Sequence, residues 1–160
     1  MKRLLALVMT TLMLISMLTG CGTPEAPAAD DNKVYDVAII QLVTHDALDA
    51  ATKGFQDALI AELGEGNVNF DLQNAAGDTN TCATIVNSFV SNDVDLIMAN
   101  ATPALQAAAA ATAEIPILGT SVTEYGVAMG IENFSGTVGN NVSGTSDRSE
   151  EHTSELQSRI

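Results

Sequence analysis

The sequence predicts an α/β domain, a doubly wound parallel sheet with helices on both faces. Apolar runs of strand length alternate along the chain with segments of helical periodicity. The first run is rich in β-branched residues, and polar and apolar residues do not alternate along it. This pattern is typical of a strand buried on both faces. The chain has 160 residues and 46% hydrophobic content, enough for a packed core.

The first strand is predicted over Asp36–Val43 (DVAIIQLV) and the first helix over Asp46–Leu63. Asp46 is the expected N-cap, and Gly64 is expected just past the end of the helix. The apolar residues of this helix recur about one turn apart, at Leu48, Ala51, Phe55, Leu59 and Leu63.

A second unit comprises a strand over Val68–Leu72, a turn over Asn74–Asp78 and a helix over Thr79–Val90. Cys82 lies on the apolar stripe of this helix, which favours a buried thiol over a reactive one. The stripe comprises Cys82, Ile85, Val86, Phe89 and Val90.

The third unit begins with a strand over Asp95–Ala99. The alanine-rich helix Thr102–Thr112 follows, with Thr102 as N-cap and Pro103 at the first helical position. A fourth strand is predicted over Ile115–Leu118, and Val142–Gly144 is expected to start a fifth.

Both ends of the chain are expected to lie outside this domain. Residues 1–20 have a basic start and an apolar run, the layout of a secretory signal peptide. A retained membrane helix is the alternative, but the run is shorter than the roughly 20 residues that a span needs. Leu18–Cys21 (LTGC) resembles the bacterial lipobox, which implies a lipid anchor on Cys21. Residues 21–33, rich in Pro, Ala and acid, are predicted to be a tether.

At the other end, RSEEHTSELQS (148–158) is an abrupt change to polar and charged residues. This string resembles the translation of a sequencing adapter, which predicts a non-native tail over 148–160; a solvated C-terminal helix is the alternative. On the first interpretation, the natural protein continues past Asp147.

Charge and motifs exclude several functional classes. Six Lys+Arg against 20 Asp+Glu give a net charge of −14, and residues 33–147 alone carry two basic and 14 acidic residues. Such a chain repels nucleic acid, so no nucleic-acid partner is expected. Hydrolase, Walker, zinc-protease and complete dinucleotide-binding signatures are absent, and no cofactor or metal is expected. Asp46 and Asp49 are explained by helix capping and the helix dipole rather than by metal binding.

The carboxyl ends of parallel strands are where open α/β sheets bind ligands. In this chain five segments follow strands there, and they are rich in hydrogen-bonding side chains: 41–46, 73–78, 100–103, 119–123 and 145–147. For His45 the alternatives are an ordinary residue before a helix, a ligand contact or a general base. Thr102 is either an N-cap only or part of a helix start that receives a carboxylate. The hydroxyls after the fourth strand are either a ligand-binding cluster or a polar loop.

Five segments, in this order and spacing, resemble the tryptophan/tyrosine-type substrate-binding proteins of ABC transporters: QLVTHDALDAATKGF, FDLQNAAGD, DLIMANATPALQAAAAAT, IPILGTSVTE and NNVSGTSD. The resemblance implies a type I periplasmic-binding-protein fold, in which two lobes close on a ligand. Residues 34–139 would form the N-terminal lobe, and 140–147 the hinge and start of the second. The implied ligand-binding residues are Gln41, His45, Asn74, Thr102, Thr120, Ser121, Thr123 and Asp147.

The resemblance further implies a lipid-anchored protein on the outer face of the cell membrane, which captures an amino acid, often an aromatic one, and delivers it to a permease and its ATPase. It implies no enzyme activity. A sensor that presents the ligand to a membrane receptor is the main alternative, and a Rossmann-like enzyme domain is a weaker one. Because one lobe supplies half a cleft, we expect the 160-residue chain to bind its ligand weakly.

Overall fold

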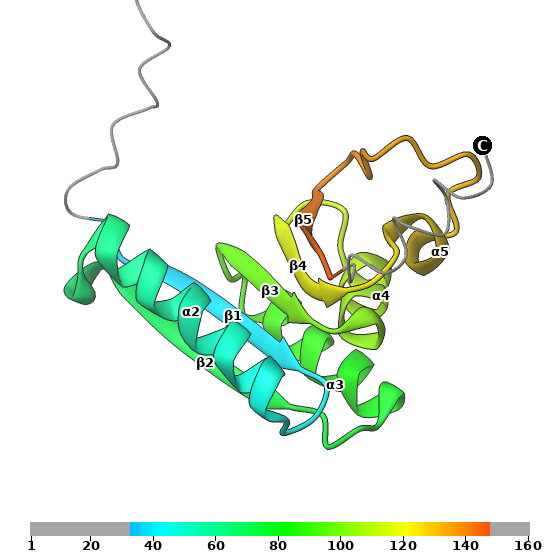
Figure 1. The fold of residues 1–160 in the computed structure, drawn as a ribbon. Helices are drawn as coiled ribbons and strands as arrows, with labels where there is room; N and C mark the ends of the chain where they lie inside the picture. The colour runs from blue at the N-terminus through cyan, green and yellow to red at the C-terminus, as the bar shows by residue number, and fades with distance from the viewer. Residues whose placement is uncertain (1–32, 148–160) are drawn as a thin grey trace, which may run out of the picture. The chain divides into compact units, whose positions relative to one another are not determined.

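A computed structural model describes residues 33–147, which form a five-stranded parallel sheet in the order β2-β1-β3-β4-β5 (Figure 1). The predicted signal peptide, most of the tether and the tail lie outside the described residues. The strands are β1 (Tyr35–Gln41), β2 (Val68–Asn74), β3 (Leu96–Asn100), β4 (Ile117–Val122) and β5 (Val142–Ser146). The parallel α/β architecture predicted from the alternating pattern is therefore confirmed.

Helices cover both faces of the sheet (Figure 1). The helix α2 (Asp46–Leu63) lies on one face, and α3 (Thr79–Ser91) and α4 (Thr102–Ala111) pack on the other. Two short elements were not predicted, the 3₁₀ turn η2 (Glu65–Asn67) and the helix α5 (Tyr125–Met129). The predicted bounds of α2 are confirmed, and Gly64 ends it with a φ of +91°.

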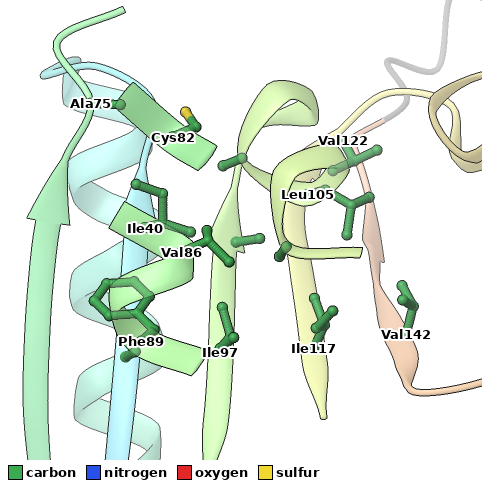
Figure 2. Packing of buried hydrophobic residues seen from close by; sticks show 14 of the residues in the cluster. Ile40, Ala75, Cys82, Val86, Phe89, Ile97, Leu105, Ile117, Val122 and Val142 are labelled. Atoms are coloured by element: carbon green, nitrogen blue, oxygen red, sulfur yellow. The ribbon is translucent and has the colours of Figure 1, made fainter. Parts of the chain in front are cut away.

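The main core lies between the sheet and the α3–α4 layer (Figure 2). Ile40 and Ile97 from central strands pack there with Val86 and Phe89 of α3 and Leu105 of α4. Cys82 is fully buried in the same layer, as its position on the stripe predicted. Burial raises the pKa of its thiol, and the charge of Asp78 adds to the effect.

The α2 layer is packed differently. The predicted apolar stripe of α2 is only half-buried, and the one fully buried residue of the helix is Thr52. Beneath α2 the sheet presents the buried side chains of Ile39 and Met98, but its last row at the carboxyl edge is polar. The inner surface of α2 therefore combines an apolar part with a hydrogen-bonding part.

At the amino edge of the sheet, Asp95 joins the starts of β1 and β3. Its carboxylate accepts hydrogen bonds from Lys33 Nζ (2.6 Å) and from the backbone N–H of Asp36 (2.9 Å). These two donors, the lysine first, lower the pKa of Asp95. Chain entry into β1 is thus fixed at the edge opposite the expected ligand site.

Near the carboxyl edge, β4 contains a bulge that Tyr125 fills. Tyr125 Oη donates to the carbonyl oxygens of Gly119 (2.8 Å) and Thr145 (3.3 Å), and the register of β4 against β5 shifts between Gly119 and Val122. Burial raises the pKa of this phenol. The short helix α5 is thereby attached to the last two strands.

Candidate functional site

A row of polar side chains crosses the carboxyl edge of the sheet, one from each strand. The strand register makes Gln41 the neighbour of Asn74 on one side and of Asn100 on the other. Asn100 is paired in turn with Thr120, whose hydroxyl lies 3.4 Å from that of Thr145. Five strands thus present amides and hydroxyls on the face that α2 covers.

The N-terminus of α4 lies at the same edge and differs from those of the other helices described. Side chains cap α2, α3 and α5: His45 accepts from Ala47 N, Asp78 from Thr81 N and Glu124 from Gly126 N. The N-cap of α4 is Ala101, which has no capping side chain. The N–H groups of Thr102 and Ala104 are therefore left for a partner outside the helix, because Pro103 has no N–H and Leu105 N donates to Ala101 O.

Two predicted caps are wrong by one residue. His45, not Asp46, caps α2, and its Nδ1 lies 3.2 Å from Ala47 N. Ala101, not Thr102, precedes α4, so Thr102 and Pro103 are its first and second helical residues. The bounds of a helix are uncertain by one or two residues when they are predicted from cap preferences alone.

Ala101 has φ 96° and ψ 156°, a region that is essentially restricted to glycine. Its N–H donates to Thr120 O (3.0 Å), and its C=O accepts the first helical bond from Leu105 N (3.0 Å). The backbone between β3 and α4 is therefore held on both sides in a conformation that costs energy.

Gln41 and Asn74 both lie in the polar row, but their side chains are already engaged. Gln41 is only 4% exposed and is hydrogen-bonded to α2 and to its own loop. Asn74 Oδ1 accepts from Ala76 N (2.8 Å), and its Nδ2 donates to Thr44 Oγ1 (3.2 Å). Direct ligand contact by these two residues stays a prediction.

The hydroxyl cluster lies partly within β4 rather than after it, because the strand is longer than predicted. Ser121 adopts a φ of +54° at the bulge. Thr123 is exposed, and its carbonyl accepts from Ser146 Oγ (3.0 Å). Asp147 is exposed, and its N–H donates to Val122 O (2.9 Å). The fifth strand therefore brings Asp147 beside the end of β4.

Sequence reasoning missed Thr52 and the role of Ala101, and it singled out Asn100 and Thr145 only as parts of segments. Thr52 lies between the apolar positions of α2, so a periodicity count passes over it. The signal that could have found it is a β-branched hydroxyl residue nearly two turns after the start of a helix, in a chain whose neighbouring strands end in amides, Gln41 and Asn100.

Two hollows lie near this edge. One, of about 310 Å³, is bordered by α2 and the ends of β1 and β2, and Gln41, Asp49, Thr52 and Asn74 line it. A larger one, of about 540 Å³, lies between α5, the loop 134–139 and β5. The larger hollow is away from the centre of the carboxyl edge, so topology favours the polar row as the ligand site.

Within residues 33–147, no group of three His, Cys, Asp or Glu side chains is placed to hold a metal ion. In the same range no helix has both the length and the apolar character needed to cross a bilayer. The polar row and the start of α4 offer hydrogen bonding by amides, hydroxyls and a helix N-terminus.

Residues 36–157 match the family model described as ABC transporter substrate binding protein. The chain belongs to this family. Its members bind solutes and are not enzymes. The match runs into the segment predicted to be a non-native tail, and that interpretation stays a prediction.

Curated and solved relatives agree with this assignment. A tyrosine-binding protein of Clostridioides difficile is 42% identical over 155 residues, covering 91% of this chain and 45% of the relative. The ligand-free, open structure of a substrate-binding protein with adhesive properties from Clostridium difficile is 43% identical, with a TM-score of 0.68 over 79% of this chain and 43% of that one. A Streptococcus pneumoniae ABC domain in complex with L-Trp is 33% identical, with a TM-score of 0.67 over 72% of this chain and 39% of that one.

The chain spans less than half the length of these relatives. The structural matches confirm that its sheet is one lobe of the type I periplasmic-binding-protein fold.

Proposed function

We propose that this chain is the N-terminal lobe of a lipid-anchored, extracytoplasmic solute-binding protein that captures an amino acid for an ABC permease and its ATPase. The aromatic class is favoured, because relatives above 30% identity are named for tyrosine binding or hold L-Trp. Lobe closure around the ligand would exclude water from the polar row.

The uncapped N-terminus of α4 carries this proposal. An amino acid has a carboxylate, and a helix N-terminus offers free N–H groups and the positive end of the helix dipole to such a group. In three other helices a side chain of the protein accepts a hydrogen bond from an N–H group of the first turn. The N-cap of α4 is Ala101, which has no such side chain. Thr102 adds a half-buried hydroxyl at the first helical position.

The ammonium group and the side chain of the ligand need other partners. Asp147 follows β5 and is exposed at the carboxyl edge, where its carboxylate would attract an ammonium group. Thr120 and Thr145 would donate to or accept from polar atoms of the ligand. Val43 is 38% exposed in the loop after β1 and offers apolar contact to a ring.

Binding is tested by titrating the ¹⁵N-labelled 160-residue chain with L-tryptophan and following backbone amide shifts. We expect saturable shifts at residues 101–105 and 120–123, because these lie around the α4 N-terminus. Tryptamine, which lacks the carboxylate, should leave the 101–105 amides unmoved. Shifts confined to residues far from the carboxyl edge would contradict the proposal.

Thr102→Asp provides the matched variant, because it places a carboxylate at the first position of the uncapped helix. We expect the added charge to repel the ligand carboxylate and weaken binding about tenfold or more. Thr79→Asp is the control, since Thr79 is the first residue of α3, which Asp78 already caps. The control should bind as the wild type does.

Lipid anchoring rests on LTGC at residues 18–21, outside the described residues. Expression in a Gram-positive host with a clickable fatty-acid analogue should label the wild-type protein. Cys21→Ser should abolish the label and release the protein from the membrane fraction. Labelling that survives this substitution would remove the anchor from the proposal.

A further inference from the structure

Three polar side chains are buried among the described residues, and all three belong to one hydrogen-bonded unit. Gln41, Thr52 and Asn100 are 4%, 3% and 0% exposed. They come from β1, α2 and β3, which are separate segments of the chain. Their association is therefore a tertiary feature of the fold.

The hydroxyl of Thr52 is the centre of this unit. It donates to Gln41 Oε1 (2.7 Å) and accepts from Asn100 Nδ2 (2.9 Å). Asn100 Nδ2 also donates to Leu48 O (2.8 Å), in the first turn of α2. Thus β3 contacts α2 through two hydrogen bonds from a single amide nitrogen.

Gln41 extends the unit toward the loop after β1. Its Nε2 donates to Val43 O (3.0 Å) and to Asp49 Oδ1 (2.5 Å). The backbone adds a link, since Leu42 N donates to Asn100 O (3.3 Å). The loop from Val43 to His45 is thereby tied to both central strands.

The directional nature of these bonds sets the unit apart from apolar packing. A buried apolar contact tolerates small shifts of a helix, whereas a buried hydrogen-bond donor or acceptor that loses its partner is strongly disfavoured. The first turns of α2 are therefore restricted to one position over β1 and β3. The same strand, β3, leads directly into the α4 N-terminus.

We propose that Thr52 and Asn100 are positioning residues for ligand binding. They fix the loop Val43–His45 and the start of α2 relative to the N-terminus of α4, without touching the ligand themselves. This inference rests on the proposed function, because its main test measures the affinity for an amino acid. Asn100 Oδ1 is the one buried side-chain acceptor without a partner among the described residues, so the hydrogen bonds of this amide group run through its nitrogen.

Thr52→Val tests the proposal, because it keeps the shape of the side chain and removes the hydroxyl. We expect L-tryptophan affinity to fall about tenfold, with amide shifts concentrated at residues 42–48 and 100–103. Thr52→Ser keeps the hydroxyl and should restore both the affinity and the shifts. Thr84→Val is the control, since the exposed Thr84 hydroxyl bonds only within α3.

A merely structural role would lower the melting temperature but leave the affinity of the folded protein unchanged. Affinity within twofold of wild type in folded Thr52→Val would therefore overturn the proposal. If that variant does not fold, Asp49→Ala removes an exposed acceptor of the same unit, and it should weaken binding and move the 42–45 amides.

The two proposals fail in distinguishable ways. If the wild-type chain shows no shifts with L-tryptophan, the proposed function fails. The positioning of the loop can then still be tested without ligand. Thr52→Val should shift the backbone amide signals of the loop, whereas Thr52→Ser should not. Unmoved 42–45 amides in Thr52→Val would overturn the positioning.

Discussion

Ala101 holds a backbone conformation in which a Cβ atom is crowded by its own peptide groups. Two hydrogen bonds retain it there, from its N–H to Thr120 O and from Leu105 N to its C=O. The uncapped start of α4 and this strained residue are adjacent, so conformational energy is stored next to the proposed carboxylate site.

Ala101→Gly should therefore leave the free energy of unfolding unchanged or raise it. Glycine relieves about 1–3 kcal/mol of strain at such a position and loses about 0.4–1 kcal/mol through the more flexible unfolded chain. The control Ala83→Gly, at an exposed position inside α3, should lose about 1 kcal/mol. Urea denaturation measures both. An equal loss in the two variants would contradict the assigned strain.

Residue-level predictions from sequence succeeded where one physical effect dominates. Cys82 lies on an apolar stripe, and burial follows from that alone. The caps failed because Asp46 and Thr102 have the better cap propensities, while the tertiary fold places His45 and Ala101 at the cap positions. The cap preferences of single residues do not include where the preceding strand ends, and that position decides which residue precedes the helix.

At the scale of elements, the β4–β5 pair depends on two glycines that face Tyr125. A Cβ at Gly144 would lie too close to Tyr125 Oη and to Gly119 O, and one at Gly119 would also collide with Tyr125 Oη. These glycines let the phenol lie directly over the strands. Through this phenol, α5 is hydrogen-bonded to the carbonyl groups of both strands.

Gly144→Ala should destabilise the domain by about 1–3 kcal/mol, since the added methyl group meets backbone as well as a side chain. Gly66→Ala, in η2, is the matched control because its Cβ would meet nothing within 4 Å. Thermal unfolding followed by circular dichroism compares them. Equal melting temperatures for the two variants would contradict close packing at Tyr125.

Asp95, at the amino edge of the sheet, predicts how the stability of the domain changes at acidic pH. The pKa of Asp95 is lowered in the folded state, so its stabilisation is complete above its ordinary pKa near 4 and is lost as pH falls through the lowered value. Asp95→Asn should therefore destabilise the protein at pH 7 but have less effect at pH 3. Urea denaturation at both pH values measures the free energy of unfolding. Asp57→Asn is the control: it removes the exposed ion pair between Lys53 and Asp57 and should change the free energy of unfolding little at either pH.

Element prediction was reliable for long periodic segments and poor for short or mixed ones. The bounds of α2 followed from periodicity, yet its packing did not, because its one fully buried residue is a threonine bonded to two strands. The helix α5 has five residues, too few for a periodic signal. The end of β4 was missed because polar residues from Thr120 onward resemble a loop.

At the scale of the molecule, the carboxyl edge assembled as expected because parallel topology alone brings strand ends together. Which side chains are free for a ligand could not be predicted, since Gln41 and Asn74 are engaged by contacts that only the fold creates. The family resemblance carried the functional interpretation further than the composition could.

A single lobe should bind weakly. This chain covers 45% of its curated tyrosine-binding relative. In the proposed function, the carboxyl edge of the lobe supplies only one wall of the ligand cleft. Calorimetry of the 160-residue chain with L-tryptophan or L-tyrosine should give an affinity weaker than micromolar, because one wall does not exclude water. Sub-micromolar affinity would show that one wall suffices.

The position of β1 also determines how the lobe resists mechanical force. The chain enters β1 shortly after Lys33, and β1 is hydrogen-bonded along its length to parallel strands on both sides. A pull from the N-terminal side along the strand therefore shears two ladders of hydrogen bonds at once, rather than peeling one strand from an edge. A force applied at this end would load a strand that is paired on both sides, at the edge of the sheet opposite the polar row.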